Sequence, residues 1–307
     1  MFDTTDATSG YRHEALLYRD DAEFLAATVP FIAEGVARQE AVMVAVTAHN
    51  TALLKDSLGW DAHWVDFVDM EALGRNPGRI IAAWRRFVAD HADDPAMRGI
   101  GEPVWGTRGP EELDECYIHE LLLNVAIDGP LHLICPYRTP DLSAEVVTRA
   151  ANSHPSGPHP GREEIIHVAL TLPLPTRPPV VRAIAFDSGS RADACAVAIR
   201  DSRGLSAARS SRLAVALNEL TAMSARSARG RGTLRMWTTV DRVYCEVADE
   251  EPLADPLAGR DARPLRDLDL HGLALVHEVC DLVQVRSDDA GTTVRVSMEL
   301  EEPATGR

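Results

Sequence analysis

The sequence predicts an α/β protein with two domains, a mostly parallel α/β domain followed by an α/β sandwich. Its 307 residues, 45% of them hydrophobic, are enough for more than one core. The first half alternates helical and strand-like segments, whereas the last third ends in long paired strands. Between them the proline-rich segment LTLPLPTRPPVV at 170–181 favours an extended spacer over a helix. We therefore expect domains at 8–170 and 180–302, joined by a linker at 171–179.

The first domain is expected to contain a parallel sheet flanked by helices. Residues 21–39 carry apolar side chains near helical spacing, and the apolar run AVMVAV at 41–46 is typical of a buried parallel strand. Elements of the same kinds follow along the chain: a helix at 51–58, a strand at 64–68, helices at 77–90 and 110–126, and a strand at 131–135. This alternation is typical of α/β units.

The second domain is expected to be a layered sandwich with an antiparallel sheet. The expected elements are a strand at 180–185, helices at 190–201 and 206–228, strands at 233–239 and 242–247, a helix at 272–279, and strands at 282–287 and 291–300. Long sequential strands pair most readily as antiparallel neighbours, and the helices then cover one face.

Charge and composition exclude several classes of function. The net charge of −16 argues against general nucleic-acid binding, which needs basic patches, and suits a basic protein partner. Of 31 basic residues only Lys55 is a lysine, and its surroundings lack the glycine loop of a phosphate-binding P-loop. No apolar run is long enough to span a bilayer and the N-terminus has no signal-peptide pattern, so we expect a cytoplasmic protein.

The cysteines do not form a metal-binding or disulfide pattern. No C-x-x-C pair is present, so the sequence indicates reduced and mostly buried thiols. The five positions are Cys116, Cys135, Cys195, Cys245 and Cys280.

Three segments of the second domain carry a shared pattern. Asn218, Glu219 and Leu220 lie on a predicted helix, Asp249 follows a predicted strand, and His271, Gly272 and Leu273 open another helix. The pattern resembles the GHKL (Bergerat) ATP-binding fold of anti-sigma-factor kinases. That resemblance implies that Glu219 activates the attacking group, that Asp249 binds adenine, and that ATP and Mg²⁺ are ligands.

Several positions depart from the GHKL pattern. The magnesium-binding asparagine of the family corresponds to Met223, which offers no hard oxygen. Glu251 stands where the adenine-binding turn has glycine, and its charge repels a triphosphate by about 1 to 4 kcal/mol per close pair. Leu270 replaces the first glycine of the phosphate lid, whereas Gly272 and Leu273 remain. Thr293 is expected to face the former nucleotide site. These changes speak against ordinary ATP binding, so we assign no cofactor. Weak or metal-independent nucleotide binding through Asp249 stays open as the alternative.

The first domain resembles the MEDS sensory domain, which is coupled to a GHKL-type domain in actinobacterial RsbA-type anti-sigma regulators. The resemblance rests on five segments in order and covers nearly the whole domain. They are YRHEALLYRD (11–20), FIAEGVARQEAVMVAV (31–46), GEPVWGTRGPEELDECYIHELLLNVA (101–126), LICPYRTPDL (133–142) and SHP (153–155). His13 resembles an N-terminal histidine of the family, but no dimerisation helix pair surrounds it, which argues against phosphotransfer.

Polar and reactive residues in these apolar segments are expected to converge near strand ends as a sensory pocket. They are His13, Glu102, Trp105, His119, Glu120, Asn124, Cys135, Tyr137 and His154. Three interpretations stay open: hydrogen bonds that tie loops together, a small-ligand pocket, or a metal or redox site of His119, Cys135 and Glu102. We assign no metal ligands from the sequence.

The resemblance implies an anti-sigma-type regulator that works by partner switching in stress-response transcription. Its partners would be a sigma factor or a STAS anti-anti-sigma protein, bound by a pseudokinase module with lost or weakened activity, and a homodimer is implied by analogy. One alternative is an active ATP-dependent serine/threonine kinase of a STAS protein. Another is a small-molecule sensor with a dimerising C-terminal domain.

Overall fold

The protein is described by a computed structural model that covers residues 10–154, 160–179, 181–227, 229–260 and 272–301. The chain divides into two compact units, residues 1–165 and 166–307. The division lies inside helix α7 (Arg162–Thr171), a few residues before the position expected from the proline-rich segment. Among the described residues each unit holds one five-stranded sheet, parallel in the first and antiparallel in the second, which confirms the predicted fold class.

The sheet of the first unit has the strand order β1-β5-β4-β2-β3, with every neighbouring pair parallel. The strands are β1 (Arg12–Tyr18), β2 (Ala41–Val46), β3 (Asp66–Asp69), β4 (Met97–Gly101) and β5 (Leu131–Arg138). β2 is almost fully buried because helices cover both faces, as the continuous apolar run indicates.

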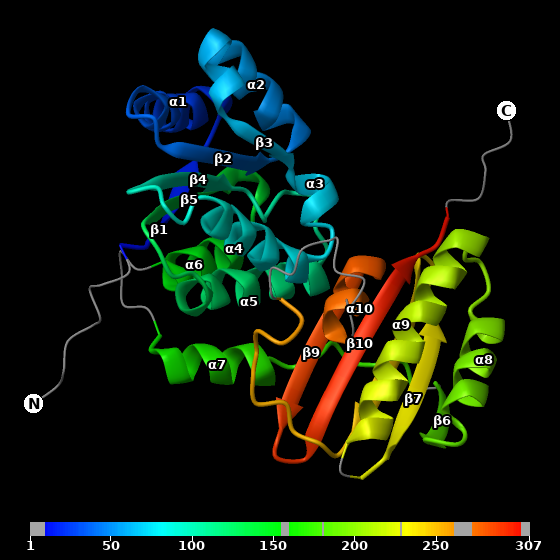
Figure 1. The fold of residues 1–307 in the computed structure, drawn as a ribbon. Helices are drawn as coiled ribbons and strands as arrows, with labels where there is room; N and C mark the ends of the chain where they lie inside the picture. The colour runs from blue at the N-terminus through cyan, green and yellow to red at the C-terminus, as the bar shows by residue number, and fades with distance from the viewer. Residues whose placement is uncertain (1–9, 155–159, 180, 228, 261–271, 302–307) are drawn as a thin grey trace, which may run out of the picture. The chain divides into compact units, whose positions relative to one another are not determined.

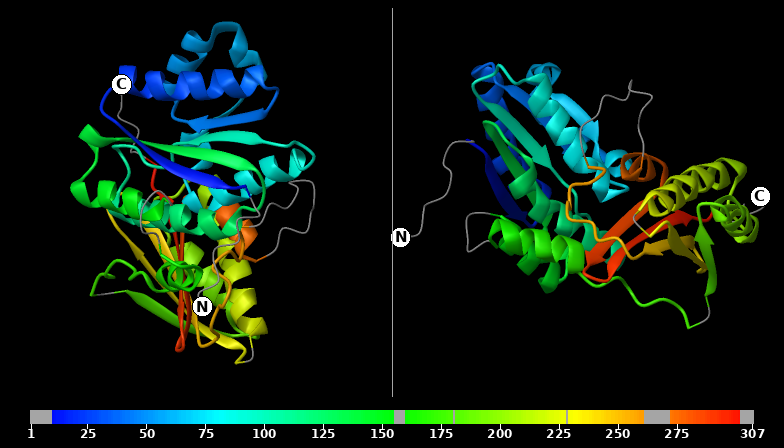
Figure 2. Two further views of the ribbon diagram at one scale, coloured as in Figure 1. Left: turned by 90° about the vertical axis from the view of Figure 1, so that its left-hand side faces the viewer. Right: turned by 60° about the horizontal axis from the view of Figure 1, so that its bottom comes forward.

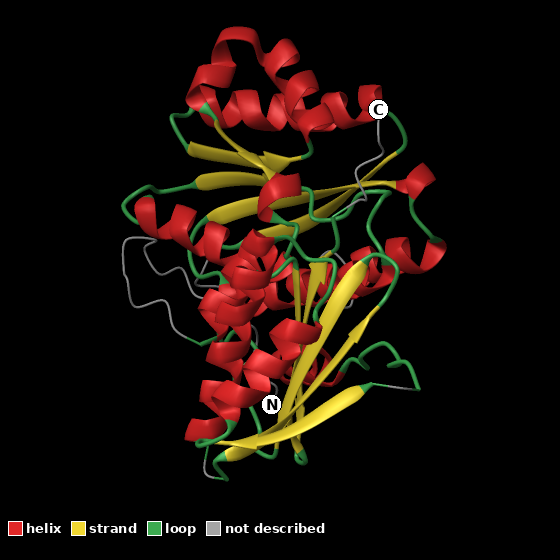
Figure 3. Ribbon diagram, turned by 90° about the vertical axis from the view of Figure 1, so that its right-hand side faces the viewer, coloured by secondary structure: helices red, strands yellow, loops and turns green. Residues whose placement is uncertain are grey.

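Helices lie on both faces of this sheet (Figures 1 and 3). Helices α1 and α2 cover one face, and α4, α5 and α6 cover the other. The helices are α1 (Asp21–Ala37), α2 (Ala48–Leu58), α3 (Met70–Leu73), α4 (Ile80–Asp90), α5 (Pro110–Ala126) and α6 (Ala144–Ser153), with short 3₁₀ turns η1 (Gly59–Trp64), η2 (Pro77–Arg79) and η3 (Thr139–Asp141). The N-cap of α1 is Asp20, whose carboxylate accepts from the Glu23 backbone N–H.

Two strands, β1 and β4, were not predicted. β4 reads MRGIG, and its glycines are sites of close packing: a Cβ on Gly99 would lie 2.6 Å from the ring of Trp84 in α4. Glycine therefore allows the indole to lie directly against the strand. Polar residues in β1 and glycines in β4 interrupt the apolar pattern by which a strand is recognised in the sequence.

The sheet of the second unit has the order β6-β7-β8-β10-β9, with every neighbouring pair antiparallel. Helices α8, α9 and α10 pack on one face (Figures 2 and 3). The elements are β6 (Arg182–Asp187), α8 (Arg191–Asp201), α9 (Ala207–Arg226), β7 (Arg231–Thr238), β8 (Arg242–Asp249), α10 (Leu273–Val279), β9 (Leu282–Asp288) and β10 (Gly291–Glu299). The core joins inward-facing residues of the strands to the apolar faces of these helices.

The proline-rich segment packs against the opposite face of this sheet. Residues 173–178 have no regular secondary structure, as predicted. Arg295 Nη1 donates to the Pro175 carbonyl at 2.8 Å, and Arg286 donates to the Leu172 carbonyl. Arg177 forms an ion pair of 3.1 Å with Glu246 on β8. The segment is therefore part of the second unit and not a free spacer.

All five cysteines are free thiols, and four of them are buried. Within the described ranges, no helix is long and apolar enough to cross a membrane.

Candidate functional site

A pocket of about 280 Å³ lies in the second unit between α9, the ends of β8 and β10, and the chain that follows β8. Its lining is mostly apolar, with charged groups at one side. The lining residues are Leu220, Met223, Ser224, Arg226, Ser227, Val247, Asp249, Glu251, Pro252, Leu253, Leu273, Thr292 and Val294. This is the place at which the sequence pattern predicts a nucleotide site, although its volume is at the low end of small-molecule pockets, which run from about 300 to 1,000 Å³.

On the α9 side, Met223 lines the pocket, and Glu219 and Gly272 lie next to it. Glu219 Oε2 accepts a hydrogen bond from the Gly272 backbone N–H at 2.9 Å. Gly272 has a φ of +64°, and a Cβ there would lie 3.3 Å from the Met223 sulfur. The carboxylate that would activate an attacking group therefore holds the start of α10, and a thioether occupies the position expected for a magnesium ligand.

The opposite side of the pocket is a turn that follows β8. Asp249 Oδ1 accepts from the Glu251 N–H at 2.9 Å, and the Thr292 hydroxyl donates to the Glu251 carbonyl at 2.6 Å. The Leu253 N–H donates to Ser287 Oγ at 2.7 Å. Asp249 thus lines the pocket as predicted, but one of its oxygens already forms part of the turn. Glu251 is exposed at the rim and brings a second negative charge to the same side.

The prediction for Thr293 is corrected by the structure. Thr292 lines this pocket, whereas Thr293 lines a separate hollow with Arg235 and Glu246 on the other face of the sheet. The reason is that successive side chains of a strand point to opposite faces, so an error of one residue changes the face. Leu270 and His271 lie outside the described residues.

In the first unit the predicted sensory residues form two separate groups, not a single pocket. Glu102 and Trp105 line an open pocket of about 750 Å³ at the carboxyl ends of β1, β2 and β4, where ligands bind in parallel sheets. Glu102 accepts from Thr47 N–H and Oγ, both at 3.0 Å, and from Asn50 Nδ2 at 2.9 Å. Tyr18 Oη donates to the same carboxylate at 3.2 Å.

Burial raises the pKa of Glu102, although hydrogen bonds from Thr47, Asn50 and Tyr18 act in the opposite direction. Burial, followed by the charge of Glu102, also raises the pKa of Tyr18. Thr47, Asn50 and Tyr18 were not predicted as site residues. Thr47 directly follows the apolar run 41–46, and this position after a buried strand was a signal in the sequence.

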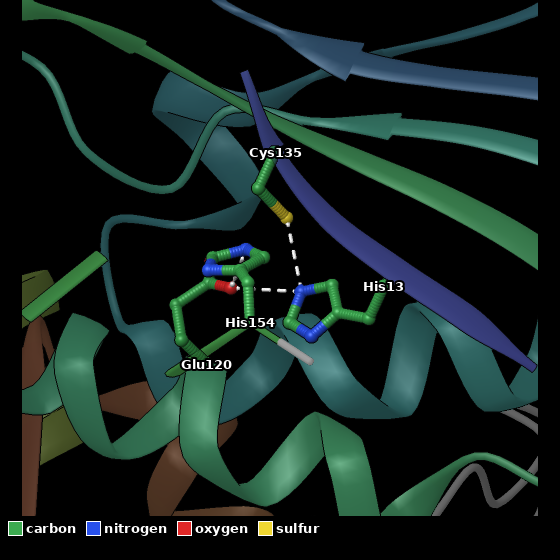
Figure 4. Close-up of side chains that lie close together, drawn as sticks. All are labelled: His13, Glu120, Cys135 and His154. Atoms are coloured by element: carbon green, nitrogen blue, oxygen red, sulfur yellow. Dashed lines mark hydrogen bonds and ion pairs between the residues drawn. The ribbon is translucent and has the colours of Figure 1, made fainter. Parts of the chain in front are cut away.

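The second group contains His13 on β1, Glu120 on α5, Cys135 on β5 and His154 just after α6 (Figure 4). All four side chains are buried, and one potential ligand atom from each lies within 4.8 Å of the others. His13 Nε2 lies 2.9 Å from Glu120 Oε2 and 3.3 Å from Cys135 Sγ. His154 Nε2 lies 3.2 Å from the same Glu120 oxygen.

Neighbouring side chains complete the surroundings of this group. The rings of Tyr11 and Tyr137 lie 5.9 Å from those of His13 and His154, respectively, and Asn124 Oδ1 lies 3.1 Å from His13 Nδ1. Burial lowers the pKa of His13 and raises the pKa of the Cys135 thiol, which Glu120 raises further. Adjacent aromatic rings and full burial make this a closed site.

The alternative metal set of His119, Cys135 and Glu102 is also corrected. Glu102 is bound to Thr47 and Asn50 in the other group, and His119 is buried but is not one of the four clustered residues. Successive helical residues point about 100° apart, so only Glu120 of this pair on α5 faces Cys135. Cys135 is the one member of the predicted set that belongs to the cluster.

Two family models match the chain. Residues 12–155 match the MEDS domain, the methanogen/methylotroph DcmR sensory domain, and residues 188–298 match the histidine kinase-like ATPase domain. No curated protein matches the chain. The chain is therefore a signalling regulator in which a MEDS sensory domain precedes a histidine kinase-like ATPase domain, the architecture of the RsbA-type proteins that its sequence resembles.

Proposed function

We propose that this regulator acts by binding a protein partner, a sigma factor or a STAS anti-anti-sigma protein, under the control of its MEDS domain. In this proposal the protein is cytoplasmic and takes part in partner switching that controls stress-response transcription. The net charge of −16 supports a protein partner with basic surface, because opposite charges speed association and suppress wrong partners.

The observation that carries the proposal is the chemistry of the ATPase pocket. Met223 presents sulfur where a magnesium ion needs a hard oxygen, and Glu219 is engaged with the Gly272 N–H. Asp249 and Glu251 add negative charge to a pocket that would have to accept phosphates. Since phosphoryl transfer depends on charge neutralisation by metal and cationic groups, we infer weak or absent kinase activity.

One observation favours a second candidate, an active serine/threonine kinase of a STAS protein. Asp249, which the resemblance assigns to adenine, still lines the pocket, and Glu219, which it assigns to activation, is retained on α9, where it accepts from the Gly272 N–H. Stoichiometric phosphate transfer to a STAS protein that disappears in Glu219→Ala would establish this candidate. The third candidate, a small-molecule sensor with a dimerising C-terminal domain, is favoured by the pocket around Glu102.

The test is calorimetric titration of the full-length protein with ATP and Mg²⁺. We expect no binding by the wild type and binding by the double variant Met223→Asn, Glu251→Gly, which restores the metal oxygen and removes the rim charge. Val215→Asn is the matched control, because Val215 is exposed on the same helix. Micromolar ATP binding by the wild type would favour the active kinase over the binding-only regulator.

Partner binding is tested separately, by titrating the nucleotide-free full-length protein with purified sigma factors and STAS proteins. The proposal expects a stable complex with at least one of them. Absence of any complex, with and without ATP, would refute the anti-sigma function and leave the small-molecule sensor.

A further inference from the structure

We propose that His13, Glu120, Cys135 and His154 bind one divalent transition-metal ion inside the MEDS domain, and that zinc is the ion that suits them best. We call these four residues the metal-site cluster. The cluster is separate from the ATPase pocket, so the inference does not depend on the proposed protein partner.

Three of the distances among the four ligand atoms are close to those around a tetrahedral ion, and all four atoms lie within 4.8 Å of one another. Zinc binds imidazole nitrogen at about 2.0 to 2.1 Å and thiolate sulfur at about 2.3 Å, so tetrahedral ligand atoms lie about 3.3 to 3.6 Å apart. The contacts at Glu120 Oε2 are 2.9 and 3.2 Å, and that between His13 Nε2 and Cys135 Sγ is 3.3 Å. Small shifts of buried side chains would centre an ion among them.

The hydrogen bonds behind His154 determine which of its nitrogens carries a proton. His154 Nδ1 lies 2.6 Å from the Ala150 carbonyl oxygen, which can only accept, so Nδ1 must donate. In a neutral imidazole Nε2 is then the unprotonated atom. It points at the Glu120 carboxylate, with Nε2 3.2 Å from Oε2. A backbone carbonyl behind a ligating histidine is the usual arrangement in metal sites.

The same reasoning applies to His13. Asn124 Nδ2 donates to the Ser153 carbonyl at 2.8 Å, which orients the amide so that its Oδ1 faces His13 Nδ1 at 3.1 Å. An amide oxygen accepts, so His13 Nδ1 carries the proton and Nε2 presents a lone pair to Glu120 and Cys135. Asn124 is therefore a positioning residue.

Together these tautomers bring electron-pair donors face to face. With both imidazoles neutral, two ring nitrogens present lone pairs to one carboxylate oxygen at 2.9 and 3.2 Å, which is repulsive in a buried site. Among the described residues, these two histidines lie within 4 Å of the Glu120 carboxylate, and no arginine or lysine forms an ion pair with it. A divalent cation removes the repulsion, and it balances the charges of Glu120 and a Cys135 thiolate.

The donor set selects the class of metal. Two imidazoles, a thiolate and a carboxylate are ligands of zinc and related transition metals, whereas magnesium and calcium require oxygen donors. The four residues come from β1, α5, β5 and the end of α6, so a bound ion would join distant parts of the sequence. Metal binding would then stabilise the folded MEDS domain.

The test uses the full-length protein, stripped with a chelator and then loaded with Zn²⁺ or Co²⁺. We expect about one equivalent of zinc by elemental analysis, as a single site requires. Co²⁺ should give the intense visible bands of tetrahedral coordination and a near-ultraviolet thiolate-to-metal band. Cys135→Ser should remove the thiolate band, whereas the control Cys116→Ser, an equally buried cysteine of the same domain, should retain it.

A further variant separates loss of metal binding from loss of folding. Asn124→Ala leaves all four ligands in place and should weaken Co²⁺ affinity by about 10- to 100-fold, with circular dichroism used to verify folding. Folded wild-type protein that takes up no stoichiometric zinc or cobalt would overturn the proposal. Retention of the thiolate band in Cys135→Ser would also overturn it, because the metal would then bind elsewhere.

Discussion

Removal of the Glu246 carboxylate should destabilise the second domain far more than removal of a comparable surface carboxylate. Glu246 lies on β8 with its side chain 3% exposed, and it meets three arginines. Arg295 on β10 donates from Nη2 at 3.0 Å and from Nε at 3.3 Å, while Arg177 and Arg235 lie at 3.1 and 3.4 Å. The carboxylate thus joins the proline-rich segment to three strands.

The magnitude follows from the burial of Arg295. Its side chain is also 3% exposed, so Glu246→Ala leaves a buried guanidinium without its carboxylate, a change that typically costs about 3 to 5 kcal/mol. The Pro175 carbonyl at 2.8 Å and the Trp237 ring at 5.1 Å remain as partners and favour the lower end of that range. Arg177 is 41% exposed, so Arg177→Ala should cost only about 0 to 1 kcal/mol.

Hydrogen exchange of the β8 and β10 amides in the full-length protein measures this effect within the second domain. A loss of 3 to 5 kcal/mol should accelerate exchange through unfolding on the order of 10²- to 10³-fold or more. Glu250→Ala is the matched control, because Glu250 also pairs with two arginines, Arg229 and Arg231, but is 48% exposed. Acceleration below tenfold in Glu246→Ala, or equal effects in the two variants, would refute the reasoning.

Two further predictions concern the first domain. Gly99→Ala should cost about 1 to 3 kcal/mol in a denaturant titration, because the new Cβ would lie 2.6 Å from Trp84; an equal loss in Gly161→Ala, where nothing lies within 4 Å, would contradict this. The raised pKa of Glu102 means that the folded state binds its proton more tightly than the unfolded state. Its contribution to stability is therefore complete below the unfolded pKa and is lost as pH rises through the folded pKa. In Glu102→Gln, the unfolding temperature should fall less steeply as pH rises from acidic to neutral than it does in the wild type. An unchanged pH profile of the unfolding temperature would contradict this prediction.

Local patterns in the sequence were sufficient to predict most of the helices and strands. The apolar run 41–46 coincides with β2, the helix 110–126 with α5, and the proline-rich segment with a stretch of irregular backbone. These features depend on near-neighbour periodicity and backbone restriction, which a sequence displays directly. The order of MEDS and ATPase-like domains was also visible, because each family pattern lies in consecutive segments.

Arrangements that depend on contacts between distant segments needed the tertiary structure. β1 and β4 became recognisable as strands through pairing with β5, since polar residues at the start of β1 and glycines in β4 interrupt the apolar pattern. Thr292, not Thr293, faces the ATPase pocket because strand register determines the face.

The sensory residues separated for the same reason. The sequence selected His13, Glu120, Cys135 and His154 as reactive groups in apolar segments, but it also grouped them with Glu102. Parallel pairing of β1 with β5 brings His13 beside Cys135, and packing of α5 and α6 adds Glu120 and His154. The sequence by itself determined which side chains can ligate or titrate. Only the tertiary structure decided which of them meet, because their convergence comes from long-range strand pairing and helix packing that no local pattern encodes.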